Sequence, residues 1–291
     1  MVGAPLNLDM DVLRTFVTGM DLGSFAKAAE RLGRSPSAIS LHLRKLEGQL
    51  GQPLVRRHGR GLVPTEAGEV LMAYARRILD LNDEARLALG GLGALDGWVR
   101  VGVPQDFAET WLPQLLARFQ RAYPKVRVEA RVDRGSCLAD AVASGTLDLA
   151  LTWGALGRPD GEIVADMRLA WIAGTEHHPI DGEPVALVAF DGACAFRHRA
   201  TAALDAAGMP WRQVFATSSL SGVWAAVRAG LGLTARTAGL IPSDLCEIDP
   251  SGAGLPALGS IELVLHSAPS ATPATGVFRE LLLEAVGTGA A

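Results

Sequence analysis

Residues 24–51, SFAKAAERLGRSPSAISLHLRKLEGQLG, constrain the fold more than any other stretch, because they read as two helices joined by a tight turn. The first helix is predicted over residues 24–32 and ends at Gly33, since glycine readily takes the left-handed conformation that ends a helix. The second is predicted to begin with Ser35 as N-cap and Pro36 at the first helical position, where a missing N–H costs nothing. This arrangement predicts a helix-turn-helix.

The second helix has two different faces. Its apolar residues are spaced four, three and four apart and form one narrow stripe toward a core: Ile39, Leu43, Leu46 and Leu50. An ordinary amphipathic hairpin with a solvated polar face would show the same pattern, so the stretch alone leaves both interpretations open. If the helix enters a major groove, the residues placed to meet DNA are Arg34, Ser35, Ser37, Ser40, Leu41, Arg44 and Lys45.

The residues after the hairpin favour DNA binding. Residues 53–68, PLVRRHGRGLVPTEAG, read as two short strand-like pieces around a basic tip at residues 56–61, followed by Thr65 capping a new helix. A basic hairpin beside a recognition helix is a wing, which meets phosphates or a minor groove. The wing residues predicted to contact DNA are Arg56, Arg57 and Arg60.

Residues 8–68 resemble the winged helix-turn-helix of LysR-type transcriptional regulators. The resemblance is carried by LRTFV at 13–17, GSFAKAAERLGRSPSAIS at 23–40, the Leu46–Glu47 pair and PLVRRHGRGLVPTEAG. One departure stands out: the family usually has a polar or basic pair after Ser40, whereas this chain has Leu41 and His42. On a groove-facing surface the leucine is suited to touching a thymine methyl group.

The net charge of −4 is unevenly divided along the chain. Residues 1–64 hold nine Arg and Lys against five acids, a net charge of +4, and the remainder carries −8. This asymmetry turns the acidic body away from a duplex while the basic head docks. Because a head of +4 is only moderately basic, we expect an oligomer on repeated half-sites.

A long helix is predicted after the wing. From residue 66 to 89 there is no proline, and apolar residues alternate in steps of four and three like a heptad seam. A helix packed on its own domain would show a broader stripe, and Val70 and Leu79 do widen this one. In the resembled family the equivalent helix pairs two subunits, and the residues predicted for this seam are Ala67, Leu71, Tyr74, Ile78, Leu81, Ala85 and Ala88.

These features predict an α/β protein with distinct parts. Residues 1–65 form the winged helix-turn-helix, 66–89 the linker helix, and the glycine-rich residues 90–97 a hinge. From 98 to 291, apolar strand-like runs alternate with helices, which predicts a mostly parallel, doubly wound sheet. The runs include residues 98–104, 126–132, 147–153, 169–174, 185–190, 214–217, 230–235 and 261–266. Two lobes are expected, at about 98–168 with 259–291 and at about 169–258, enclosing a hinged cleft.

Open α/β sheets bind ligands outside the carboxyl ends of their strands. Helix N-termini and hydroxyl groups at these ends suit a small organic anion, whereas Asp106 favours an amino or hydroxyl group. The serines are equally well explained as helix N-caps, and Trp153 as a core residue. The predicted effector contacts are Gln105, Asp106, Ser136, Cys137, Thr152, Trp153, Ser218 and Ser219.

The C-terminal part resembles the LysR-type effector domain, which is similar in fold to type 2 periplasmic binding proteins. Residues 119–151 and 224–236 carry this resemblance, and residues 196–236 look closest to the LrhA/HexA-like branch. The resemblance implies a regulator that binds double-stranded promoter DNA as a dimer through the linker helix, and as a homotetramer. A metabolite is expected to change how the tetramer bends DNA, with RNA polymerase as a further partner.

Other classes of protein fit less well. No GxSxG, HExxH or GxGxxG in the right context marks an enzyme, and no cofactor or metal is expected. A transport-type binding protein fits the body but not the basic head, and an enzyme with an accessory helix-turn-helix is the remaining alternative. No apolar run reaches the length of a membrane span, and no signal peptide is recognisable, so a cytoplasmic location is expected. Cys137, Cys194 and Cys246 are expected to be reduced thiols, with a redox role left open.

Overall fold

The computed structural model describes residues 7–58, 61–90, 95–154, 161–175, 183–269 and 272–289. The chain divides into two compact units, with the main boundary between residues 94 and 95. Part of the predicted hinge, residues 91–94, lies outside the described residues. Each unit is described by itself.

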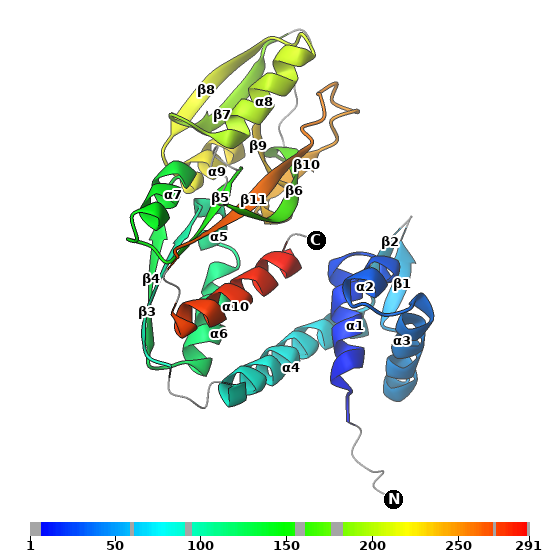
Figure 1. The fold of residues 1–291 in the computed structure, drawn as a ribbon. Coiled ribbons are helices and arrows are strands. Elements are labelled where there is room, and N and C mark those ends of the chain that lie inside the picture. The colour runs from blue at the N-terminus through cyan, green and yellow to red at the C-terminus, as the bar shows by residue number, and fades with distance from the viewer. Residues whose placement is uncertain are drawn as a thin grey trace, which may run out of the picture. The chain divides into compact units, whose positions relative to one another are not determined.

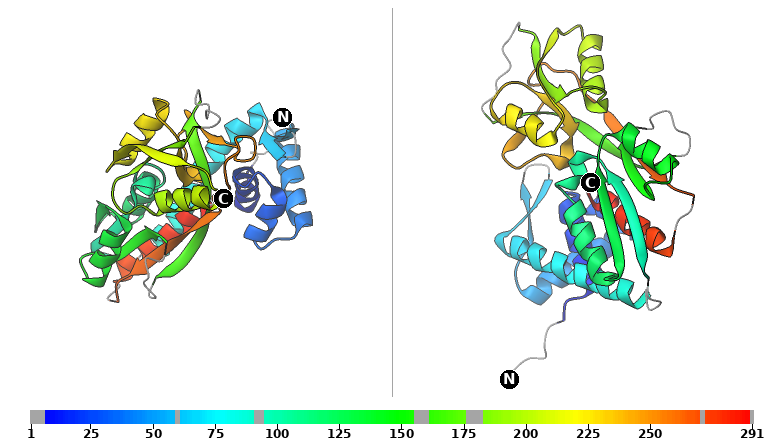
Figure 2. Two further views of the ribbon diagram at one scale, coloured as in Figure 1. Left: turned by 90° about the horizontal axis from the view of Figure 1, so that it is seen from above. Right: turned by 90° about the vertical axis from the view of Figure 1, so that its left-hand side faces the viewer.

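The N-terminal unit consists of helices with one β-hairpin (Figures 1 and 2). The hairpin strands are antiparallel, with Val55 opposite Pro64 and Arg57 opposite Leu62. The elements are α1 (Met10–Asp21), α2 (Phe25–Arg31), α3 (Pro36–Leu50), β1 (Val55–His58), β2 (Gly61–Pro64) and α4 (Glu66–Gly90).

The turn between α2 and α3 forms from local sequence signals. The Ser24 hydroxyl caps α2 by accepting from the backbone N–H of Lys27. Gly33 has a φ of 60°, and its N–H and that of Arg34 donate to the carbonyls of Glu30 and Ala29, which is a Schellman motif. Ser35 then caps α3, with Pro36 in the first turn. The predicted helix end at Gly33 and the predicted cap at Ser35 are therefore both present, and Ser24 is an N-cap rather than the first helical residue.

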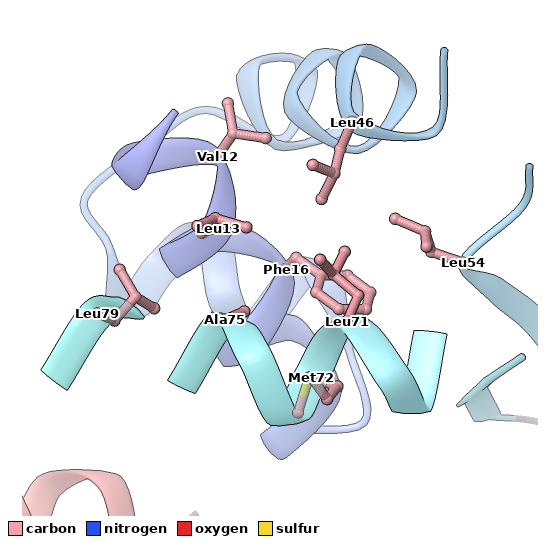
Figure 3. Close-up of a cluster of buried hydrophobic side chains, with 9 residues drawn as sticks. All are labelled: Val12, Leu13, Phe16, Leu46, Leu54, Leu71, Met72, Ala75 and Leu79. Atoms are coloured by element: carbon pink, nitrogen blue, oxygen red, sulfur yellow. The ribbon is translucent and has the colours of Figure 1, made fainter. Parts of the chain in front are cut away.

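A single apolar core joins α1, α3 and α4 (Figure 3). Phe16 lies between the helices and is 1% exposed, and Leu46 of α3 and Leu54 before the hairpin are fully buried. The linker helix contributes four residues to the same core: Leu71, Met72, Ala75 and Leu79.

This core corrects part of the predicted dimer seam. Leu71 is buried within its own unit, and Ala67 and Ile78 pack partly buried against the same core, so these three face inward. The broader stripe produced by Leu79 was the signal for this packing. Tyr74, Leu81 and Ala85 are exposed, and the side chain of Ala88 lies outside the described residues.

Two ion pairs also connect α4 to α1. Arg14 bonds Asp83 at 2.6 Å, and Arg76 bonds Asp21 at 2.6 Å. Partly exposed pairs of this kind contribute at most about 1 kcal/mol each, so the apolar core dominates the attachment. The linker helix is therefore a structural part of the N-terminal unit.

The C-terminal unit alternates strands and helices along the chain. Its elements are β3 (Gly97–Val103), α5 (Gln105–Ala108), α6 (Leu112–Ala122), β4 (Val126–Val132), α7 (Gly135–Ala143), β5 (Leu149–Trp153), β6 (Glu162–Gly174), β7 (Val185–Phe190), α8 (Ala195–Ala206), β8 (Trp211–Thr217), α9 (Leu220–Arg228), β9 (Thr234–Thr237), the 3-10 helix η1 (Ala238–Leu240), β10 (Leu245–Ile248), β11 (Ser260–Ser267) and α10 (Pro273–Gly289).

The main sheet is mixed, which corrects the prediction of a mostly parallel one. Among the described strands its order is β10-β6-β11-β5-β3-β4, with β9 also on β6. Only the pairs β3–β4 and β3–β5 in it are parallel, whereas β11 runs against β5 and β6, and β9 and β10 run against β6. The antiparallel pairs arise because β6 and β11 carry the chain between the two halves of the unit. A second sheet pairs β7 with β8 in parallel.

Strand β6 defines the two lobes because it changes partners along its length. It pairs with β11 through Arg168, and with β9 and β10 from Leu169 onward. Lobe 1 therefore holds β3, β4, β5, β11 and the first half of β6, and lobe 2 holds the second half of β6 with β7 to β10. The chain returns to lobe 1 at Gly259, whose carbonyl accepts from the Leu169 N–H at 2.9 Å. The sequence predicted a strand only at 169–174 and gave no sign of residues 162–168, which are mostly exposed and lack a long apolar run.

The predicted strand at residues 230–235 begins later than expected, at Thr234. Gly230 has a φ of 73°, which forms a turn after α9. A Cβ on Gly232 would lie 2.4 Å from the Ala186 carbonyl oxygen, so this glycine serves close contact with β7. Glycine conformation and crowding explain the shift.

Helices cover both lobes. In lobe 1, α7 lies against β3 and β5, and α10 against β3 and β6. In lobe 2, α9 lies against β6, β7 and β8, and α8 against β9. Within the described part of the chain, none of the helices has the length and apolar character needed to cross a bilayer.

Two glycines provide a matched test of the N-terminal packing. A Cβ on Gly68 would lie 2.1 Å from the backbone oxygen of Leu54, so Gly68→Ala should destabilise the unit by about 1–3 kcal/mol. Gly48 is exposed within α3 and has free space around its Cβ position, so Gly48→Ala should stabilise by about 0.5–1 kcal/mol. Native-state hydrogen exchange of α1 and α3 amides in the full chain measures both effects. Equal protection in the two variants would contradict the close packing at Gly68.

Candidate nucleic-acid interface and effector cleft

Helix α3 presents one buried face and one open face. Ile39 and Leu46 are buried, while Leu43 and Leu50 are half-buried. The open face carries exposed Ser37, Ser40, Leu41, Arg44 and Lys45, and Leu41 is 60% exposed. Because Leu41 is so exposed, its side chain does not pack inside the unit. It is therefore free to contact the edge of a base.

The two residues that depart from the family pattern have separate environments. His42 turns toward α1, where its Nδ1 lies 2.9 Å from the Thr15 hydroxyl. Thr15 is buried and its hydroxyl donates to the Asp11 carbonyl. His42 therefore supports the contact between α1 and α3, and Leu41 is the member of the pair that faces outward.

The predicted DNA-binding serines already have partners within the unit. The Ser35 hydroxyl accepts from the Ala38 N–H and lies 2.9 Å from the Ser37 hydroxyl. The Ser40 hydroxyl donates to the Pro36 carbonyl at 3.0 Å. Ser35 therefore acts as a helix cap, and Ser37 and Ser40 keep exposed oxygens that can accept or donate further bonds.

Two of the predicted DNA-binding cations form ion pairs with the start of α1. Lys45 bonds Asp9 and Arg34 bonds Asp11, each at 3.1 Å. The hydrogen bond from Lys45 is the main cause that lowers the pKa of Asp9 below its usual value. Asp9 also caps α1 through the Asp11 and Val12 N–H groups. DNA phosphates would have to displace these carboxylates.

Other predicted cations remain available. Arg44, Arg56 and Arg57 are exposed and make no ion pair with the described residues, although the Arg44 Nε donates to the Ser40 carbonyl at 3.3 Å. Arg56 and Arg57 lie on β1 rather than at the tip of the hairpin, which corrects the prediction: the strand extends to His58. Arg60 lies outside the described residues.

Two residues without a predicted functional role hold the hairpin on the helices. The Glu47 carboxylate accepts from the Leu54 N–H at 2.8 Å, and the Thr65 hydroxyl donates to the Pro53 carbonyl at 2.8 Å. Thr65 also caps α4 through Gly68. These bonds fix where β1 begins relative to α3.

In the C-terminal unit, several predicted effector residues lie where the two lobes touch. Gln105, at the start of α5 in lobe 1, donates to the Ser218 carbonyl at 3.2 Å and accepts from the Leu220 N–H at 2.6 Å. Gln105 therefore caps α9 of lobe 2. Ser219 occupies the N-cap of the same helix by accepting from Gly222, as the N-cap interpretation expects.

Asp106 is buried rather than open to a ligand, which differs from the prediction. One of its oxygens lies 3.4 Å from Nη1 of Arg236 on β9, and the other accepts from the Trp153 indole at 3.3 Å. Asp106 is 4% exposed and Arg236 is 1% exposed. Arg236 was not among the predicted site residues, although an arginine that ends the apolar run GLGLTAR was an available signal.

Arg236 is enclosed by aromatic rings. Its guanidinium carbon lies 4.2 Å from the Phe190 ring centre and 4.6 Å from that of Phe196. Trp153 stacks on Phe107 at 5.0 Å and meets Phe196 edge-on at 5.2 Å. Aromatic side chains of both lobes thus surround the buried Asp106–Arg236 pair.

The remaining predicted contacts have different positions. Ser136 and Cys137 are exposed in the first turn of α7, next to Arg134, which pairs with Asp191 of lobe 2. Thr152 is fully buried and its hydroxyl lies 3.0 Å from Nε2 of His266, so the prediction that it faces a ligand is wrong. Side chains alternate along β5, and Thr152 therefore points away from the face that Trp153 uses.

The histidine, cysteine and acidic side chains of the described residues are dispersed. Within the described ranges, His, Cys, Asp and Glu side chains do not gather in groups of three or more that could hold a metal ion. The three cysteines are free thiols. The Cys194 sulfur accepts from the Arg197 N–H at the start of α8, and that of Cys246 donates to backbone carbonyls of β6.

Comparisons with known proteins match both units. The family described as bacterial regulatory helix-turn-helix protein, lysR family, matches residues 10–69, and the LysR substrate binding domain matches residues 93–287. The chain therefore belongs to the LysR family of DNA-binding transcriptional regulators, which combine a helix-turn-helix with an effector-binding domain. It is not an enzyme.

Two relatives agree with this assignment. The HTH-type transcriptional regulator PecT of Dickeya dadantii (strain 3937) is 37% identical over 240 residues, which cover 82% of this chain and 76% of PecT. DgdR of Burkholderia cepacia, also an HTH-type transcriptional regulator, is 36% identical over 259 residues, covering 87% and 86%.

Two solved structures share the fold. HinK, a LysR family transcriptional regulator from Pseudomonas aeruginosa, has a TM-score of 0.54 at 21% identity and covers 96% of this chain and 98% of its own. Full-length BenM has a TM-score of 0.51 at 18% identity, with coverages of 96% and 97%. The resemblance of residues 196–236 to the LrhA/HexA-like branch stays a prediction.

Arginine substitutions on α3 and the hairpin should weaken DNA binding in different ways. Arg44→Ala should weaken the free energy of binding by about 1–3 kcal/mol on the preferred DNA and by less on unrelated DNA, because a groove-facing arginine reads bases.

Arg57→Ala should weaken binding to all DNA sequences. It should also lower the slope of log affinity against log salt concentration by about 0.9, because one phosphate contact is lost. Fluorescence anisotropy at several salt concentrations measures both. Arg228→Ala, an exposed arginine of lobe 2, is the control, and an equal loss in this variant would contradict the assignment.

Asp9→Asn should strengthen DNA binding. Asparagine caps a helix as well as aspartate does, but it releases Lys45 for phosphate contact. The expected result is a higher affinity for any duplex and a steeper salt dependence, measured by the same titrations. Asp21→Asn, which frees Arg76 on α4, is the matched control. Unchanged affinity in Asp9→Asn would mean that Lys45 does not reach DNA.

Proposed function

We propose that this regulator binds promoter DNA through the open face of α3 and the basic β1–β2 hairpin. The observation that carries this is a set of exposed arginines without acidic partners among the described residues: Arg44 on α3, and Arg56 and Arg57 on β1. Leu41, also exposed on α3, adds an apolar side chain to the same surface. The cations supply affinity for phosphates, and the α3 face supplies base contacts. PecT and DgdR, both named transcriptional regulators, support this function.

The exposed face of α4 supports a dimer. Val70, Tyr74 and Leu81 are 57%, 58% and 63% exposed, although they are large and apolar. They follow one another at steps of four and seven, so they share one stripe of the helix, on the side not used by the core. We propose that this stripe packs against its copy in a second chain, and that two dimers form a tetramer. A dimer places two α3 helices on two half-sites.

The C-terminal unit is proposed to bind a small organic molecule that carries a carboxylate, between lobes 1 and 2. Gln105, Asp106 and Trp153 of lobe 1 meet α9 and β9 of lobe 2, so a molecule inserted there changes how the lobes touch. Binding energy that differs between two lobe arrangements shifts their populations. We propose that this shift alters the arrangement of subunits on DNA and the recruitment of RNA polymerase. We propose that the protein acts in the cytoplasm, where promoter DNA lies in bacteria such as the sources of PecT and DgdR.

The substitution Leu81→Glu tests the proposed dimer and its DNA binding together. A charge in the apolar stripe should weaken self-association by several kcal/mol, because a glutamate would be buried without a partner. The expected result is a monomer by analytical ultracentrifugation that binds the DNA upstream of a neighbouring gene at least about tenfold more weakly than the unchanged chain.

The control for this variant is Leu231→Glu, which places the same charge at an exposed leucine of the C-terminal unit. It should leave both the oligomer and DNA binding intact. A Leu81→Glu protein that still dimerises would contradict the assignment of α4, and an unchanged chain that binds no upstream DNA would contradict the proposed function itself.

A further inference from the structure

The buried pair formed by Asp106 and Arg236 is the main polar contact inside the junction of the two lobes. Asp106 belongs to α5 in lobe 1 and Arg236 to β9 in lobe 2, and both side chains are almost completely buried. The chain separates them by 130 residues. Burying two charges is unfavourable unless their geometry is close and their remaining hydrogen-bonding groups are satisfied.

The observed geometry meets these conditions only in part. The single contact is 3.4 Å long, and it is not the paired, two-bond arrangement that arginine and carboxylate favour. Within the part of the chain that the structure describes, the Arg236 Nε also lacks a hydrogen-bond partner. Both charged groups therefore keep unused bonding capacity in a place closed to solvent.

The charges decide which ligand can take up this capacity. A simple anion that bonded Arg236 in place of Asp106 would leave the aspartate buried and unpaired, and a simple cation would leave the arginine so. Only a molecule carrying both signs of charge close together pairs both groups at once. An α-amino acid does this, with its ammonium on Asp106 and its carboxylate on Arg236.

We propose that the effector is a free α-amino acid, bound between Asp106 and Arg236 when the lobes part. This inference rests on the proposed function of the C-terminal unit and specifies its ligand. In this structure the two residues pair with each other, so Arg236 occupies the place of the ligand's ammonium and Asp106 the place of its carboxylate. Asp106 thereby accounts for the preference for an amino group, and Arg236 for the preference for a carboxylate.

The surroundings define the side chain of the amino acid. Phe107 and Trp153 of lobe 1 and Phe196 of lobe 2 stack around the pair, so an apolar side chain fits better than a charged one. Asp106 is only 4% exposed and Arg236 only 1% exposed, so the lobes must separate before an amino acid can reach both.

Separation has defined costs at the edge of the junction. The Gln105 bonds to Ser218 and Leu220 and the exposed Arg134–Asp191 pair must break or rearrange. The amino acid replaces the Asp106–Arg236 contact with two new charged contacts. The state with ligand therefore has a different lobe arrangement from the state without it.

The test uses the full chain and the twenty common L-amino acids, added one at a time. At least one amino acid with an apolar side chain should raise the melting temperature in a saturable way and change the affinity for upstream DNA. Its N-acetyl derivative, which lacks the ammonium, and its amide, which lacks the carboxylate, should each bind roughly thirtyfold more weakly or worse. These two probes separate an amino acid from a simple anion or amine.

Variants place the binding at the buried pair. Asp106→Asn keeps the size and an acceptor for Trp153, and it should lose the amino-acid response. Because a lone buried Arg236 can destabilise the fold, the double variant Asp106→Asn/Arg236→Gln removes both charges; it should remain folded and bind DNA without any response to amino acids. Asp244→Asn, which breaks the exposed Arg228–Asp244 pair of lobe 2, should respond like the unchanged chain.

Each outcome separates the inference from the proposed function. DNA binding with no response to any amino acid, or a response that survives in the double variant, overturns the amino-acid site and leaves the DNA-binding function standing. Equal binding of the N-acetyl derivative overturns the zwitterion and points to a simple organic acid. A chain that binds no upstream DNA overturns the proposed function, whatever the amino acids do.

Discussion

The apolar core shared by α1, α3 and α4 determines how the N-terminal unit can act. Because Leu71, Ala75 and Leu79 bury one side of α4 against Phe16, the linker helix has a fixed direction relative to α3. Only the other side of α4 is open to a second chain. In the proposed dimer, the spacing of the two recognition helices is therefore defined by this core together with the exposed stripe.

Charge has different roles in the two units. At the proposed DNA-binding surface the pairs Lys45–Asp9 and Arg34–Asp11 are exposed, so salt screens them and a phosphate can replace the carboxylate in each. Between the lobes, Asp106 and Arg236 are sealed by aromatic rings, and exchange there needs a partner that satisfies both charges. The exposed surface therefore suits any negatively charged backbone, whereas the buried pair suits only a ligand that carries a positive and a negative charge.

Local signals made much of the fold predictable. Gly33, Ser35 and Pro36 act on backbone groups close to them in sequence, and the helix-turn-helix formed where they predicted it. Contacts distant in sequence were not predictable: no pattern links Asp106 to Arg236, and alternation along β5 gave no sign of which face Thr152 would take. The linker helix was predictable only in part. Its apolar spacing fitted a dimer seam, but the spacing could not show which side of the helix would be buried in the core of its own unit.

The two crossings between the lobes have a mechanical consequence. The Leu169 N–H and the Gly259 carbonyl bond the outgoing and the returning chain to each other, so both crossings lie at one place. Lobe 2 can therefore turn about that place as a lever, with β6 as a continuous arm. A small rotation at the pivot becomes a larger displacement at the end of the lever, where β7 and β8 lie. The hydrogen bond between the two crossings thus defines where lobe 2 would rotate, and the distance from there to β7 and β8 defines how far that end would move.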